Sequence, residues 1–126
     1  MLTSEVTDII NALQVFPVAT ASADGVPNLV YVAFLRVIDD ETIEIADNRF
    51  FKTRQNLEAN PTMSLTFWSP ECQGCFQVKG SIEIVTDGEI YDQCVEWVHS
   101  RNAKLTPKAS IRMHVQEIYA GAERVA

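Results

Sequence analysis

The chain has 126 residues, and its 10 Lys and Arg against 17 Asp and Glu give a formal net charge of −7. This length predicts one domain, residues 1–126, and the 47% apolar share is enough for one core. The acidic balance argues against nucleic acid and anionic membranes as partners, because both are bound by basic surfaces. Any anion that this protein binds must therefore be held by a local group of cations.

The first residues, Met1 to Glu5, contain neither a basic segment nor an apolar one, and the sequence has no apolar run long enough to cross a membrane. Three cysteines, Cys72, Cys75 and Cys94, are an odd number, which favours reduced thiols over a disulfide framework. We therefore expect a cytoplasmic protein.

The first half of the chain predicts a helix followed by three strands. Apolar residues at helical spacing run from Val6 to Leu13, and Thr3 or Ser4 is suited to cap the helix start. Apolar runs over 15–22 and 29–38, separated by a turn at 23–25, predict a hairpin. Alternation over 42–46 predicts a third strand.

The second half predicts a short helix that starts in 49–57, then strands over 62–68 and 75–85. A capping box of Thr86 and Glu89 predicts a helix that runs to about Arg101, and alternation over 111–116 predicts the last strand.

Short connections between these strands predict antiparallel pairing. A sheet of six strands in so small a chain leaves fewer open edges when it curls, so we expect a mainly β protein, a small six-stranded antiparallel barrel with peripheral helices. Gly80, inside the fifth strand, is expected at a bulge or at a close approach of two backbones.

In this order and spacing, the sequence resembles the pyridoxamine 5′-phosphate oxidase-like superfamily of FMN-binding split barrels, especially its short members that consist of little more than the barrel. The resemblance covers nearly the whole chain. It is carried by Phe16-Pro17-Val18-Ala19-Thr20 with the Asp24-Gly25 turn, the strand 29–36, the segment 49–57, Asn60-Pro61, and Phe76-Gln77-Val78-Lys79-Gly80.

The resemblance implies an FMN-dependent oxidoreductase of unknown substrate, a homodimer with two FMN molecules at the subunit interface. It also implies a set of cofactor contacts from four parts of the chain. These are Tyr31, Val32, Ala33, Phe34 and Arg36 along the flavin and its tail; Ala46 and Asp47 at the ring edge; Phe51, Lys52 and Thr53 at the phosphate; and Cys75 and Gln77 from the second subunit.

The segment 49–57 favours a phosphate site on physical grounds also, because a helix N-terminus offers unpaired N–H groups and a positive dipole end. Lys52, Arg54 and Arg49 add positive charge. Lys52 and the Thr53 hydroxyl would bind the phosphate, with Arg36 reaching in from a neighbouring strand. The alternative is a solvated basic helix that balances nearby acidic residues. Asp47 would repel a phosphate, so we expect it to cap the helix or to face the flavin edge.

Tyr31 stands where the oxidase members carry arginine, and it either contacts the cofactor or packs in the core. Cys72 and Cys75 form a Cys-x-x-Cys pair that suits redox chemistry, half of a metal site, or two inert thiols. Three other functions stay open: a deazaflavin-dependent reductase of the same fold, an electron-carrier or flavin-storage module, and a haem- or metal-handling barrel whose Cys-x-x-Cys pair binds zinc or iron.

Overall fold

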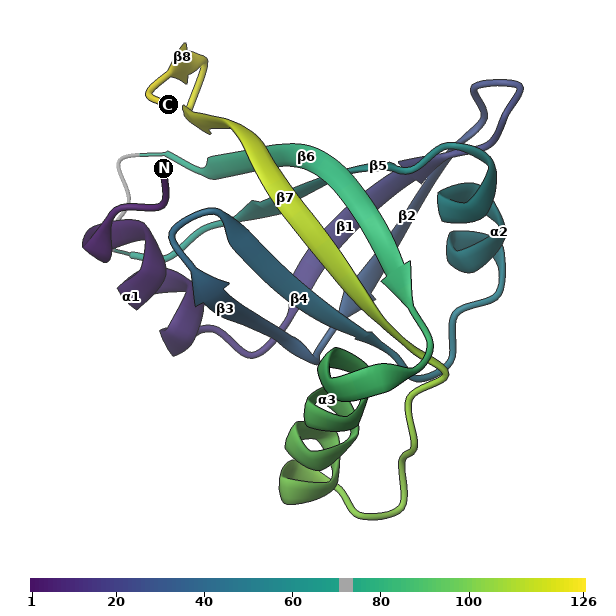
Figure 1. Cartoon of the computed structure of the whole chain (residues 1–126). Coiled ribbons are helices and arrows are strands. Elements are labelled where there is room, and N and C mark those ends of the chain that lie inside the picture. The colour runs from purple at the N-terminus through teal and green to yellow at the C-terminus, as the bar shows by residue number, and fades with distance from the viewer. Residues whose placement is uncertain (71–73) are drawn as a thin grey trace.

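A strongly curved antiparallel sheet forms the body of the protein, and three helices lie around its rim (Figure 1). The structure is a computed structural model, and it describes residues 1–70 and 74–126. The elements are α1 (Ser4–Ala12), β1 (Phe16–Ala21), β2 (Pro27–Val32), β3 (Leu35–Asp39), β4 (Thr42–Asp47), α2 (Lys52–Ala59), β5 (Thr62–Phe67), β6 (Phe76–Val85), α3 (Gly88–Arg101), β7 (Ala109–Ala120) and β8 (Glu123–Arg124).

The strand order is β2-β1-β5-β6-β7-β4-β3, and the short β8 pairs with β7. This confirms the mainly β, antiparallel split barrel with peripheral helices, although the count of six strands is too low. The apolar run 29–38 is two strands, not one: β2 pairs with β1, whereas β3 pairs with β4. The link Ala33-Phe34 therefore joins the two ends of the strand order, at the split of the barrel.

Alternating strand residues fill the barrel, because successive side chains point to opposite faces. The largest fully buried side chains include Phe16, Ile43, Ile45, Leu65 and Ile111. Helix α1 buries apolar side chains against the same core, and the predicted cap is confirmed at Thr3, whose hydroxyl accepts a hydrogen bond from the Val6 N–H (3.2 Å).

Gly80 lies at a close approach of β6 to β7, as predicted. A Cβ at this position would collide with the backbone carbonyl oxygen of His114. The register shifts here, since Lys79 pairs with Glu117 while Gly80 pairs with Val115, so the extra residue belongs to β7.

Helix α3 begins at Gly88 and not at the predicted capping box. Asp87 occupies the N-cap without a side-chain hydrogen bond, and Gly88 has a φ of +87°, a conformation that favours glycine. The helix buries Cys94 and Val98 in a second, smaller cluster, which includes Ala46 and is flanked by Phe34, Trp97 and Leu105. No helix in the described ranges has the length and apolar character needed to span a bilayer.

Candidate functional site

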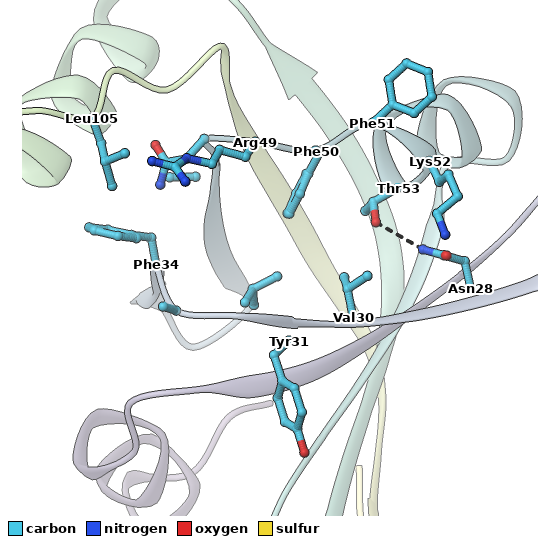
Figure 2. A pocket seen from close by; sticks show the side chains of 14 residues that line it. Asn28, Val30, Tyr31, Phe34, Arg49, Phe50, Phe51, Lys52, Thr53 and Leu105 are labelled. Carbon is cyan, nitrogen blue, oxygen red and sulfur yellow. Dashed lines mark hydrogen bonds between the residues drawn. The ribbon is translucent and has the colours of Figure 1, made fainter.

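A cavity of about 440 Å³ lies between β2, the segment that follows β4, and the start of α2 (Figure 2). Eight of the twelve residues predicted to contact a cofactor line it together. They are Tyr31, Val32, Ala33, Phe34, Ala46, Phe51, Lys52 and Thr53. The structure thus brings the predicted β2, β4 and α2 contacts to one place within a single chain.

The start of α2 forms one end of this cavity. Lys52 is its first residue and is exposed, while the Thr53 hydroxyl is buried and accepts a hydrogen bond from Asn28 Nδ2 (3.2 Å) (Figure 2). Phe51 occupies the N-cap and provides no side-chain hydrogen bond to the helix. Backbone N–H groups of the first helical turn are therefore free of a side-chain cap, which is the arrangement that binds anions.

Asp47 neither caps α2 nor lines the cavity, in contrast to both expectations. Its carboxylate is fully buried, where it accepts hydrogen bonds from the Phe50 N–H (3.0 Å) and Arg54 Nη1 (2.8 Å). Lys108 adds a second cation, with Nζ 3.9 Å from the carboxylate and hydrogen-bonded to the Phe50 carbonyl (2.7 Å). Asp47 therefore holds the segment 48–51 in place and forms an ion pair with Arg54. The negative charge of Asp47 is balanced by these cations and does not repel an anion in the cavity.

Arg36 lies away from the cavity, contrary to the expectation that it reaches a phosphate. It stands directly opposite Glu44 in the β3–β4 register, and Arg36 Nε donates to Glu44 Oε1 at 2.7 Å. Its guanidinium carbon lies 4.4 Å from the ring centroid of Trp97 in α3. A cross-strand carboxylate and an aromatic face thus hold this cation under α3.

Glu44 is buried and also accepts a short hydrogen bond from the Ser110 hydroxyl (2.6 Å). The neighbouring Cys94 thiol is buried too, and burial, followed by the negative charge of Glu44, raises its pKa to about 11. Glu44, Ser110 and Cys94 thus form a buried polar cluster beneath α3. The Cys94 thiol is protonated at neutral pH.

Three predicted contacts lie elsewhere or point outward. Tyr31 borders the cavity with its backbone, but its ring points to the opposite side of β2 from Val30 and is 75% exposed, so it is not a core residue (Figure 2). Cys75 is exposed beside the start of β6, and Gln77 lies within β6; neither lines this cavity. The Cys-x-x-Cys prediction depends on Cys72, which lies outside the described residues.

No group of three or more His, Cys, Asp or Glu side chains suited to a metal ion occurs within 1–70 and 74–126. The sequence prediction missed several residues that line the cavity: Asn28, Val30, Asn48, Phe50 and Leu105. Asn28 and Val30 lie on the face of β2 opposite to the exposed Leu29 and Tyr31. The two-residue period of a strand could have indicated that they face the cavity. Leu105 is far beyond Phe34 in the sequence, and no local pattern links the two.

Comparison with known proteins identifies relatives over nearly the full length. A model of the family described as pyridoxamine 5′-phosphate oxidase matches residues 2–121. The uncharacterized protein MJ0282 of Methanocaldococcus jannaschii is 35% identical over 105 residues, 81% of this chain and 69% of the relative. The crystal structure of tagged HupZ from Group A Streptococcus matches with a TM-score of 0.88 and 32% identity, over 100% of this chain and 99% of that chain.

Two less similar structures share the fold. An FMN-binding protein from Syntrophomonas wolfei matches with a TM-score of 0.73 and 17% identity, over 95% of this chain and 83% of that chain. HutZ, described as the heme storage protein from Vibrio cholerae, matches with a TM-score of 0.70 and 19% identity, over 98% of this chain and 99% of that chain. Because the family model matches residues 2–121, the chain belongs to the pyridoxamine 5′-phosphate oxidase family.

Proposed function

We propose that this protein is a flavoprotein that binds FMN in the cavity between β2 and α2 and acts as an oxidoreductase. The observation that carries the proposal is the composition of the cavity, which joins an apolar wall to a cationic helix N-terminus. FMN would supply the electron chemistry, while the chain supplies binding, orientation and charge.

The phosphate fits the α2 end. Lys52 offers an exposed ammonium group, the uncapped first turn offers backbone N–H donors, and Thr53 offers a hydroxyl that Asn28 holds in place. The Asp47 carboxylate, the acidic side chain nearest in sequence, is already neutralised by Arg54 and Lys108. The site therefore keeps a positive character inside a chain of net charge −7.

The isoalloxazine ring fits the apolar middle of the cavity, next to the phosphate end. Val30, Val32, Ala33 and Phe50 supply apolar surface for a flat ring. Asn48 also lines the cavity, and its side-chain oxygen is buried without a hydrogen-bond partner. A buried acceptor without a partner is costly, and a flavin ring carries an N–H group that can satisfy it.

Haem is the second ligand to consider, because the structurally similar HutZ is described as a heme storage protein. A haem iron needs an axial ligand, usually His, Cys, Met or Tyr. Among the described side chains that line the cavity none is His, Cys or Met, and Tyr31 points its ring to the other side of β2 (Figure 2). The lining therefore supports a flavin over a haem.

We further propose that two copies of the chain form a dimer through the outer side of β2. This strand is at one end of the strand order and exposes Leu29 and Tyr31, and Val26 is exposed just before it. A row of exposed apolar side chains on an edge strand is a surface that natural proteins cover. Cys75 and Gln77 would approach the partner's cofactor in such a dimer, as the resemblance implies. The cytoplasmic location stays a prediction from the sequence.

Absorption spectra of the purified protein, with and without added cofactor, test the ligand. Oxidised FMN gives two bands in the near-ultraviolet and blue, a deazaflavin gives a single violet band, and haem gives an intense Soret band. The proposal predicts the FMN spectrum, and either of the other spectra in a protein that refuses added FMN would overturn it.

Titration of cofactor-free protein with FMN tests the site. Lys52→Ala should weaken binding by about 2 kcal/mol, roughly thirty-fold, the usual size of a lost charged hydrogen bond. Lys104→Ala removes the same charge from an exposed position in the α3–β7 loop and should leave the affinity unchanged. Light scattering should give twice the 14.1 kDa mass of the chain, and a monomer would contradict the dimer.

A further inference from the structure

We propose that the end of the cavity away from Lys52 is a second binding site, for a planar organic molecule that carries a carboxylate. The inference rests on the proposed function, because this ligand would bind beside the FMN ring. It assigns a ligand class to Arg49 and Arg101, two cations that the cofactor's phosphate does not require.

Arg49 supplies the first charge. Its side chain lines the cavity and, in Figure 2, runs from the segment after β4 toward Leu105 and Phe34, away from Thr53 and Lys52. FMN has one phosphate group, and the α2 end already provides its donors. A cation at the opposite end therefore suits a different anion.

Phe34 and Leu105 form the apolar wall of this end. The Phe34 ring meets the Trp97 ring edge to face, with centroids 5.9 Å apart, so α3 holds it in position. The Arg101 guanidinium carbon lies 5.0 Å from the Phe34 centroid and brings a second positive charge to the same wall. A flat apolar surface beside two guanidinium groups is complementary to an aromatic acid.

Unlike Arg36 and Arg54, neither Arg49 nor Arg101 is held by a carboxylate among the described residues. Arg36 binds Glu44 at 2.7 Å, and Arg54 binds Asp47 at 2.8 Å. Arg49 and Arg101 have no ion pair with any carboxylate in the part of the chain that the structure describes, although the sequence has 17 acidic residues. The unpaired Arg49 guanidinium at the cavity is available for a bidentate contact with a ligand carboxylate, and Arg101 adds positive charge beside Phe34.

Calorimetric titration of the FMN-loaded protein with benzoate, and with neutral benzamide of the same shape, tests the proposal. Benzoate should bind more tightly than benzamide. Arg49→Gln should weaken benzoate binding about tenfold, the effect of one lost charged hydrogen bond, and leave benzamide unchanged. Arg101→Gln should act in the same direction and less strongly. Arg124→Gln, which removes the same charge from exposed β8, should have no effect.

Equal binding of benzoate and benzamide, or unchanged benzoate binding in Arg49→Gln, would overturn the second site while leaving the proposed FMN site intact. The FMN affinity of Arg49→Gln should equal that of the wild type; a large loss would place Arg49 in the cofactor site and would also overturn the inference. If the wild type does not bind FMN, the proposed function fails, and the same titration of cofactor-free protein still tests Arg49.

Discussion

Asp47 is the residue on which the geometry of the cavity depends most directly. Its buried carboxylate joins the end of β4 to the Phe50 N–H and to Arg54 of α2, and so determines where the segment 48–51 lies. Removing one partner of a buried ion pair typically costs about 3–5 kcal/mol. Here the cost should be lower, because Arg54 is 23% exposed and Lys108 is 52% exposed, so water can reach both cations.

We therefore expect Asp47→Asn to lower the free energy of unfolding by about 2 kcal/mol, since the amide oxygen can still accept from the Phe50 N–H. Asp47→Ala, which leaves that N–H without an acceptor, should cost about 3 kcal/mol. Urea denaturation measures both as a lower midpoint with an unchanged m-value. Asp92→Asn, an exposed substitution on α3, is the matched control and should change stability by less than about 0.5 kcal/mol.

A double-mutant cycle separates the ion pair from other effects of the substitution. Asp47→Asn combined with Arg54→Gln should cost less than the sum of the two single changes, by about 1 kcal/mol. Wild-type stability in Asp47→Asn, or strictly additive costs in the cycle, would refute the role assigned to this carboxylate.

Three further outcomes are expected. Cys94, with a pKa of about 11, should resist alkylation in the native state at pH 8. Because the pKa of this thiol is higher in the folded than in the unfolded state, the free energy of unfolding should fall as the pH rises from 9 toward 11. Cys94→Ala should abolish this part of the pH dependence. Gly80→Ala should lower the free energy of unfolding by about 1–3 kcal/mol, because the new methyl group meets the His114 carbonyl; unchanged denaturation would refute the close approach. Thr3→Ala should cost about 1 kcal/mol through loss of the α1 cap, measured in the same way, and no change would mean that the cap contributes nothing.

The elements that could be predicted from the sequence are those with a strong period or a clear terminator. Alternation located β4 and β7, and helical spacing with Thr3 located α1. The break between β2 and β3 could not be predicted, because Ala33 and Phe34 are ordinary strand residues. A tertiary contact accompanies this break, since the Phe34 carbonyl accepts a hydrogen bond from the Ala46 N–H of β4.

The site shows the same division between local and tertiary information. Lys52 and Thr53 lie at a helix start that the sequence marks, and the structure places them on the cavity. Positive charge at the phosphate was also expected from Arg36 and Arg54, but Glu44 and Asp47 hold them. The pairing of cations with carboxylates depends on strand register and on burial. Neither can be derived from the order of residue types along the chain.

The central claim is that the cavity holds FMN with its phosphate at the start of α2. Equilibrium titration of cofactor-free protein with FMN and with riboflavin, in the wild type and in Lys52→Ala, tests it most directly, because the two ligands differ only in the phosphate. The wild type should prefer FMN, and Lys52→Ala should lose about 2 kcal/mol of this preference while its riboflavin affinity stays the same. Equal affinity of the wild type for the two ligands, or a preference for FMN that is undiminished in Lys52→Ala, would contradict it.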